Sequence, residues 1–349
     1  MERTLTYAEA IREATEQEMA RDPAVVVLGL GVTDHRAIYG TTRGLGERFG
    51  GERVIETPLA EDGMTGVAIG AALAGLRPIH VHIRMDFVLL AMNQLVNIAA
   101  KSRYVFGGAV SVPLVVRAII GRSWGQGAQH SQGLHALFMH VPGLKVVAPT
   151  TPHDAKGCLI ASIRDDGPVV FVEHRMLHGL RGHVPVEAYA VPFGSARVLA
   201  PGDDVTLVGI SHMALECLRA RTLLADVGMR AEVIDPVWLA PLDVDTIAAS
   251  AARTGRLVVV DTGWTTCGAS AEIVAAVLER LGGAAAVQVR RLGFAPVPCP
   301  TTHTLEQLFY PNAQRIAAAA YALSTDDSTA WAPLASGEAP EVTEFRGPF

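Results

Sequence analysis

A short glycine-containing stretch, GQGAQHSQ, occupies residues 125–132 and gathers polar side chains that can do chemistry. It lies between two apolar runs, 112–116 and 144–147, which have the composition of buried strands. A loop that follows a buried strand emerges at one edge of the sheet, where open α/β folds bind ligands. His130 suits proton transfer because imidazole titrates near neutral pH. A lone loop histidine is more often only hydrogen-bonded, so its role depends on which residues accompany it.

Acidic residues form a second candidate group in the stretch ETPLAEDG, which follows a short apolar run and opens a helix of small residues. Glu61 could simply interact with the helix dipole, which is worth about 0.3–1 kcal/mol. The small residues of GMTGVAIGAALAGL indicate close packing, either within the chain or against another subunit. Phe87, in an apolar context, is by default a core aromatic residue.

Alternating strand and helix patterns predict the elements that position these residues. A capping box, Thr6 to Glu9, starts a helix that ends before Asp22. The expected strands of the first half are 24–30, 53–55, 78–83, 112–118, 144–148 and 168–173. Those of the second half are 204–210, 230–235, 256–261 and 287–291, followed by a helix over 313–323. This alternation predicts α/β domains with mostly parallel sheets covered on both faces.

The length of 349 residues suits two domains. A connection spaced by proline and glycine over 184–201 marks the linker, so we expect domains at 1–190 and 191–323. Residues 324–349 lack periodicity and are expected to form a disordered tail.

Composition excludes several classes of protein. The chain carries 50% hydrophobic and 18% charged residues, which favours a buried subunit interface. A net charge of -6 without a basic block argues against nucleic acid. No apolar run reaches the roughly 18–20 residues that span a bilayer, and the N-terminal sequence has no apolar signal core. Four widely separated cysteines without zinc-like spacing are typical of a reduced, cytoplasmic protein.

Four motifs in order resemble a known family. They are ETPLAEDGMTGVAIGAALAGLRPI, MDFVLLAMNQLVNIAAKSRYVFGG, AQHSQ, and PGLKVVAPTTPHDAKGCLIASIRDDGPVVFVE. Together they resemble the β subunit of thiamine-diphosphate-dependent 2-oxo acid dehydrogenases, the pyruvate, branched-chain and acetoin decarboxylating components, within the transketolase superfamily. The resemblance covers residues 4–323 and implies a pyrimidine-binding domain followed by a transketolase C-terminal-like domain. The chain has no G-D-G motif followed by Asn-Asn, so it resembles the half that holds the aminopyrimidine ring and lacks the diphosphate-binding half.

The resemblance implies a role for each matching residue. Glu61 matches the carboxylate that contacts the aminopyrimidine nitrogen; a buried carboxylate with a raised pKa can perform this proton transfer. Phe87 matches the aromatic residue packed on the pyrimidine. His130 matches the histidine that assists substrate binding or acyl transfer to lipoyl sulfur. Ser131 and Gln132 are expected to hold the loop.

The resemblance also implies cofactors and partners. Thiamine diphosphate would be shared with an α subunit that holds magnesium and the diphosphate, and a second β subunit would complete an α2β2 assembly. A lipoyl acyltransferase core would dock near the tail. Some relatives bind potassium through main-chain carbonyls at the positions that match Leu114, Ser162, Asp165 and Gly167.

Three stretches depart from the family pattern. Gly29 is followed by residues 30–32, LGV, where acidic residues are usual. The sequence 122–124, RSW, replaces a glycine-rich lead into the histidine loop. Less apolar residues than expected stand beside Phe87, namely His82, Arg84, Met85 and Asp86. These substitutions are compatible with binding of thiamine diphosphate, but they do not identify the substrate.

The sequence therefore predicts the β subunit of a 2-oxo acid dehydrogenase that decarboxylates its substrate and passes the acyl group to lipoamide. One alternative is a split transketolase-like carboligase that transfers a two-carbon unit to a carbonyl or sugar acceptor. Another is a catalytically silent, stabilising subunit, although such a subunit has no need for Glu61, Phe87 and His130 together.

Overall fold

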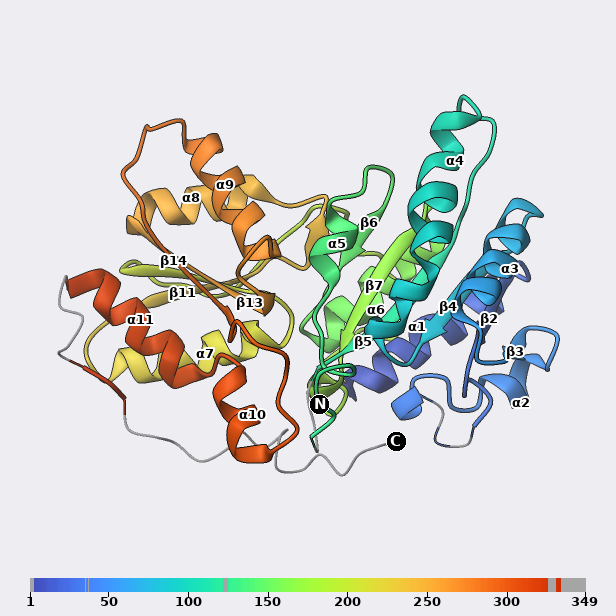
Figure 1. Cartoon of the computed structure of the whole chain (residues 1–349), viewed down its shortest axis with the longest axis horizontal. Helices are drawn as coiled ribbons and strands as arrows, with labels where there is room; N and C mark the ends of the chain where they lie inside the picture. The colour runs from blue at the N-terminus through green and yellow to red at the C-terminus, as the bar shows by residue number, and fades with distance from the viewer. Residues whose placement is uncertain (1–2, 35, 37, 122–124, 326–330, 334–349) are drawn as a thin grey trace. The chain divides into compact units, whose positions relative to one another are not determined.

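The computed structural model describes residues 3–34, 36, 38–121, 125–325 and 331–333. Contacts divide the chain into two compact units. Among the described residues, the first unit contains those of 3–121 and 130–193, and the second contains 125–129, 194–325 and 331–333. Each unit is a sheet flanked by helices (Figure 1), which confirms the predicted α/β class.

The sheet of the first unit contains six parallel strands in the order β6-β7-β5-β4-β2-β3. Their bounds are β2 (Val25–Gly29), β3 (Val54–Glu56), β4 (Arg77–His82), β5 (Val115–Ile120), β6 (Lys145–Val147) and β7 (Val169–His174). Nearly every residue of the central strands is buried, as expected for a parallel sheet covered on both faces. The continuous apolar runs of the sequence follow from this double burial.

Helices and short turns cover this sheet. The helices are α1 (Tyr7–Arg21), α2 (Leu45–Phe49), α3 (Glu61–Leu73), α4 (Ala100–Val105), α5 (His135–Met139) and α6 (Pro152–Arg164). Short 3-10 turns span Ile38–Gly40, Met85–Ala91 and Arg175–Leu177, and a π-helical segment spans Asn93–Ala99. β1 (Thr4–Thr6) pairs antiparallel with β8 (Arg181–His183). In α3, a Cβ atom added to Gly63, Gly66 or Gly70 would meet no atom of the described residues within 4 Å, so one strip of this helix is bare.

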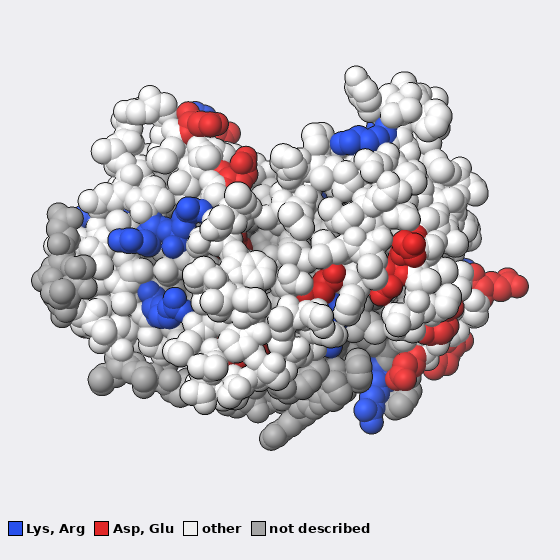
Figure 2. All heavy atoms as spheres, in the orientation of Figure 1, with Lys and Arg blue, Asp and Glu red and all other residues white. Residues whose placement is uncertain are grey.

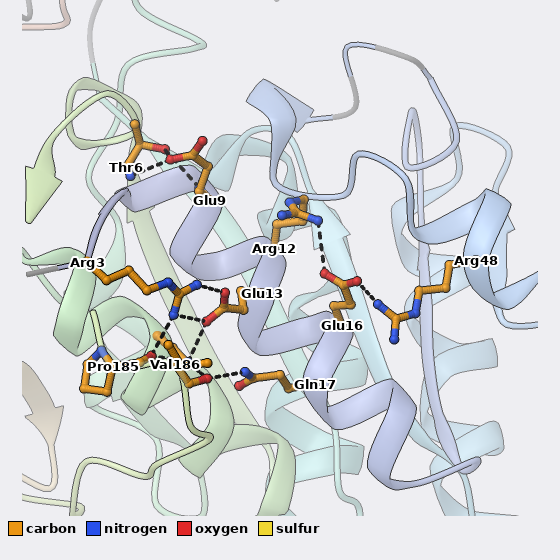
Figure 3. A network of polar contacts seen from close by, with 11 residues as sticks. Arg3, Thr6, Glu9, Arg12, Glu13, Glu16, Gln17, Arg48, Pro185 and Val186 are labelled. Carbon is orange, nitrogen blue, oxygen red and sulfur yellow. Dashed lines mark hydrogen bonds and ion pairs between the residues drawn. The ribbon is translucent and has the colours of Figure 1, made fainter. Parts of the chain in front are cut away.

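The N-terminal helix is anchored by polar contacts (Figure 3). The predicted capping box is present: the Thr6 hydroxyl accepts from Glu9 N, and the Glu9 carboxylate accepts from Thr6 N at 2.7 Å. Glu13 forms ion pairs with Arg3 and with the fully buried Lys156, whose Nζ lies 2.6 Å from Glu13 Oε1. Because Lys156 also donates to the Pro185 carbonyl, this cluster connects α1, α6 and the chain that follows β8.

A buried ion pair joins β5 to β7. Arg117 and Glu173 are both inaccessible to solvent, and Arg117 Nε and Nη2 donate to the two Glu173 oxygens at 2.5 and 2.9 Å. His178 Nε2 lies 3.3 Å from the same carboxylate, and Thr41 Oγ1 accepts from Arg117. Burial alone would raise the pKa of Glu173, but the charge of Arg117 and the hydrogen bonds outweigh it and lower that pKa to about 2.

The second unit contains a five-stranded sheet in the order β14-β13-β10-β11-β9, parallel except for the edge strand β9. Figure 1 shows α7 and α11 on one face of this sheet and α8 and α9 on the other. The strands of this sheet are β9 (Arg197–Ala200), β10 (Val205–Gly209), β11 (Ala231–Asp235), β13 (Arg256–Trp264) and β14 (Gln288–Phe294), and the short strand β12 (Trp238–Ala240) is not part of it. The helices are α7 (His212–Ala225), α8 (Val244–Thr254), α9 (Ala269–Leu281), α10 (His303–Phe309) and α11 (Ala313–Thr325).

Some element bounds differ from the sequence-based expectation. β5 begins at Val115 rather than at residue 112, because Pro113 has no N–H for a central ladder. The expected linker, 184–201, includes the edge strand β9. At the expected tail, α11 continues through Thr325, and the Trp331 ring lies 5.0 Å from Tyr321 between centroids. Residues 326–330 and 334–349 of that tail lie outside the described residues.

The distribution of basic side chains and the length of the helices indicate whether the chain has a large basic surface or a membrane-spanning segment. Lys and Arg form separate small groups on the face drawn in Figure 2, rather than one basic patch. Within the described ranges, no helix combines the length and apolar character needed to cross a bilayer.

Candidate active site

Glu61, Phe87 and His130 line one cavity of the first unit, with a volume of about 220 Å³. Each comes from a different place in the fold. Glu61 begins α3 shortly after β3, Phe87 lies in the turn Met85–Ala91 after β4, and His130 lies in the loop after β5. Loops at the carboxyl ends of parallel strands meet at one sheet edge, which explains how residues far apart in sequence come together.

The side chains of this trio are half-buried and lie against apolar walls. The Phe87 and His130 rings meet edge-on, with centroids 5.2 Å apart and an interplanar angle of 79°. The remaining wall residues are largely apolar and include Leu30, Pro58, Met64, Val81 and Ile83. A carboxylate beside a flat aromatic ring in such a cavity fits the aminopyrimidine half of thiamine diphosphate.

Three basic side chains form a further wall of the same cavity. His80, His82 and Arg84 occupy alternate positions along and just beyond β4, and all three are buried. The rings of His80 and His82 are 4.2 Å apart. Burial lowers the pKa of His80 to about 4 and, with the charge of His80, lowers the pKa of His82 well below its usual value. Both imidazoles are therefore neutral at physiological pH.

Sequence reasoning singled out His82 and Arg84 but missed His80 as a cavity residue. The alternation in HVHIR, residues 80–84, was the available signal, because residues two apart in a strand face the same side.

The histidine loop is held by Asp86. Gln132 donates to Asp86 Oδ1 through its backbone N at 3.2 Å and its side-chain Nε2 at 2.9 Å. Burial raises the pKa of Asp86, and the hydrogen bonds from Gln132 oppose that rise. Ser131 is buried, and its hydroxyl has no hydrogen-bond partner among the described residues. Asp86 and Gln132 thus position the loop next to His130.

The glycines that lead into this loop are required by close packing within the second unit. Gly125 and Gly127 have φ values of +72° and +73°. A Cβ atom on Gly125 would lie 2.3 Å from the carbonyl oxygen of Thr301. The sequence 122–124, noted as a departure from the family pattern, lies outside the described residues.

The residues after β2 that depart from the family pattern, 30–32, lie in a turn beside the cavity. Leu30 lines the cavity, and the following turn is held by Glu56, which accepts from Gly31 N at 2.5 Å and from Thr33 Oγ1 at 2.8 Å.

The four expected potassium positions lie around the ends of β5 and α6, and two of their carbonyls already accept hydrogen bonds. Leu114 O accepts from Val169 N at 2.9 Å, and Asp165 O accepts from Arg77 Nη1 at 3.0 Å. The Ser162 hydroxyl donates to Cys158 O, and Gly167 N donates to Asp165 Oδ1. No cluster of three or more His, Cys, Asp or Glu suited to a metal is found in the described part of the chain.

Comparison with known proteins defines the class. The family described as "Transketolase, pyrimidine binding domain" matches residues 3–179, and "Transketolase, C-terminal domain" matches residues 194–316. A solved split-gene transketolase, described as an inactive beta4 tetramer, superposes with a TM-score of 0.76 over 92% of this chain and 99% of that chain. At 23% identity this likeness concerns the fold alone. The chain thus has the two-domain architecture of the transketolase superfamily.

Relatives in sequence narrow the class. The β subunit of acetoin:2,6-dichlorophenolindophenol oxidoreductase from Cupriavidus necator is 44% identical, over 92% of this chain and 97% of that protein. The pyruvate dehydrogenase E1 component β subunit from Rickettsia bellii is 42% identical, over 88% of this chain and 95% of that protein. The mitochondrial E1 component subunit beta-1 from Arabidopsis thaliana is 41% identical, over 89% of this chain and 87% of that protein. The chain belongs to the family of β subunits of thiamine-diphosphate-dependent 2-oxo acid dehydrogenases.

Proposed function

We propose that this chain is the β subunit of a heteromeric enzyme that decarboxylates a 2-oxo acid and passes the acyl group to lipoamide. The observation that carries the proposal is the meeting of Glu61, Phe87 and His130 in one cavity. An acidic residue that served only the helix dipole would not need to share a cavity with an aromatic ring and a histidine.

Each of the three residues has a task that its surroundings suit. Bound thiamine diphosphate supplies a carbon nucleophile and an electron sink. Glu61 would hold a proton at the aminopyrimidine ring, Phe87 would pack against the face of that ring, and His130 would exchange protons with the substrate or with lipoyl sulfur. The apolar walls would exclude water from the reacting centre.

The missing diphosphate motif makes an α partner part of the proposal. That subunit would hold magnesium and the diphosphate, and an α2β2 assembly with a second β subunit would complete two sites. A lipoyl acyltransferase core would be a further partner. Potassium, where bound, would only stabilise the fold through main-chain carbonyls. The four cysteines form no disulfide, which supports a reducing compartment such as the cytoplasm.

A carboligase is the second candidate, and a specific observation favours it. His82, Arg84 and Asp86 make the neighbourhood of Phe87 polar, which suits an acceptor that carries hydroxyl groups. A silent stabilising subunit would be distinguished from both by the absence of turnover in any assay.

Coexpression with an α-type partner subunit tests the proposal. Purified assembly, thiamine diphosphate and magnesium are supplied with 2-oxo acids and with a lipoyl domain. Reductive acylation of the lipoyl domain is expected. Carbon–carbon bond formation from aldehydes or ketosugars, without any lipoyl-dependent rate, would overturn the dehydrogenase in favour of the carboligase.

A further inference from the structure

Arg84 is a buried cation that has no counter-charge within the described part of the chain. Its exposed fraction is 7%, and it forms no ion pair with a carboxylate among the described residues. Among the described residues, its hydrogen bonds come from Nη1 alone, which donates to Ile83 O at 2.9 Å and to Tyr39 Oη at 3.3 Å. Nε is buried and has no hydrogen-bond partner in the described ranges, and the side chain lines the cavity that contains Glu61, Phe87 and His130.

This arrangement is costly for a folded protein unless a ligand compensates it. A buried charge is normally paired, because removing an unpaired charge from water is strongly unfavourable. Arg117 shows the usual solution, since Glu173 binds it through two hydrogen bonds. At Arg84, Nη1 already donates two hydrogen bonds. Nε and Nη2 have no hydrogen-bond partner among the described residues. These two nitrogens form the edge of the guanidinium that binds a carboxylate or phosphate through two parallel hydrogen bonds.

We propose that Arg84 binds an anionic group, a carboxylate or a phosphonate-type oxyanion, on the part of the substrate that the enzyme retains. This rests on the proposed function, and it makes Arg84 the residue that selects a 2-oxo acid with a second negative charge. The departing carboxylate is a poor partner. Decarboxylation moves negative charge away from that group, so a cation held on it would stabilise the ground state more than the transition state.

Two substrates of equal length test the effect of a second negative charge on the substrate. 2-Oxovalerate and 2-oxoglutarate have five carbons each and differ by one terminal carboxylate, and 2-oxo-4-phosphonobutanoate replaces that carboxylate by a phosphonate. The coexpressed αβ assembly is assayed with each compound and an artificial electron acceptor. The same compounds are also titrated calorimetrically into the assembly before thiamine diphosphate is added. The variants are Arg84→Gln, which keeps length and loses charge, Arg84→Lys, which keeps charge and loses the fork, and Arg290→Gln as an exposed control.

The wild type is expected to prefer a dianionic compound in kcat/KM and in calorimetric affinity. Arg84→Gln should lower both quantities for the dianion by about 10- to 100-fold and leave 2-oxovalerate nearly unchanged. Arg84→Lys should fall between wild type and Arg84→Gln, and Arg290→Gln should match wild type. Preference for 2-oxoglutarate or for the phosphonate identifies which oxyanion the site takes.

Equal affinity of the wild type for mono- and dianionic compounds would overturn the proposal, as would an equal loss for both in Arg84→Gln. The wild-type comparison and the Lys variant decide the matter even if Arg84→Gln fails to assemble. If no 2-oxo acid is turned over but the Arg84-dependent binding is present, the dehydrogenase assignment fails and the assignment of Arg84 stands.

Discussion

The ring of His130 is fixed edge-on against the ring of Phe87, with 5.2 Å between centroids. The residue expected to pack on the cofactor and the residue expected to serve the substrate are thus in direct contact. Moving either ring changes the surroundings of the other. Because an edge-to-face pair contributes about 0.5–1.5 kcal/mol, this contact is strong enough to orient the imidazole within the half-buried cavity.

His130→Ala is expected to separate decarboxylation from acyl transfer. General acid–base help is worth about 10²- to 10⁴-fold, and proton transfer at the dithiolane sulfur needs it. Lipoyl-dependent turnover should fall by about 100-fold or more, while turnover with an artificial electron acceptor is partly retained. His140→Ala, which changes an exposed histidine ten residues further along the chain, serves as control. Equal losses in both assays would show that His130 acts before the acyl transfer.

Glu61→Gln is expected to abolish turnover and leave the αβ assembly intact. Glutamine keeps the shape but cannot exchange the proton, so a loss of at least about 100-fold is expected. Asp62→Asn is the matched control, because both acids lie in the first turn of α3. Each loses a similar dipole interaction of about 0.3–1 kcal/mol. Near-normal turnover of an assembled Glu61→Gln enzyme would show that Glu61 serves only the start of α3 and has no catalytic role.

The isolated chain is expected to bind thiamine diphosphate poorly, because it supplies only the pyrimidine half of the site. Calorimetry of the chain alone, with magnesium present, should detect no binding at micromolar concentrations. Micromolar affinity in that titration would contradict the need for an α partner.

The neutral histidines predict acid sensitivity. An unfolded histidine takes up a proton near pH 6.5, whereas the pKa of buried His80 is lowered to about 4. Between these values the unfolded chain binds more protons, so the free energy of unfolding falls as pH falls, by at most about 3 kcal/mol for His80. Glu173, with its pKa lowered to about 2, loses its contribution only below about pH 4.5.

Denaturant titrations at pH 7 and pH 5 measure this effect. His80→Asn should lose less stability over this interval than wild type, and His183→Asn, at an exposed position, should lose as much as wild type. Identical pH slopes for His80→Asn and wild type would show that His80 does not carry the effect.

Glu173→Gln is expected to destabilise the chain by about 3–5 kcal/mol, because it leaves the Arg117 charge buried with a neutral partner. The double variant Arg117→Met/Glu173→Leu removes both charges and should recover much of that loss. Urea midpoints of the three proteins give the comparison. A double variant no more stable than Glu173→Gln would mean that packing rather than the unpaired charge dominates.

Sequence patterns predict the parallel strands well because double burial leaves long apolar runs, as in Val25–Gly29. They overextend β5 because Pro113 sits inside an apolar run, and they miss β9 because a four-residue edge strand has too little pattern. The pairing of Arg117 with Glu173 is also hidden from the sequence. These residues are 56 positions apart, and only the register of β5 against β7 brings them together.

The candidate site was predictable to a similar degree. Glu61, Phe87 and His130 stand out through family resemblance, and the structure places them around one cavity. The burial of His80 and Arg84 was not predictable, since a strand of alternating polar residues ordinarily turns that face to solvent. Whether a polar side chain is solvated or enclosed depends on what packs over it.

The bare strip of α3 has a thermodynamic consequence. A glycine inside a helix costs about 0.5–1 kcal/mol relative to alanine, chiefly through the larger freedom of the unfolded backbone. At Gly63, Gly66 and Gly70 no neighbour among the described residues would clash with a methyl group. Alanine at these positions is therefore sterically compatible with the described part of the chain, and each glycine leaves the isolated chain about 0.5–1 kcal/mol less stable than alanine would.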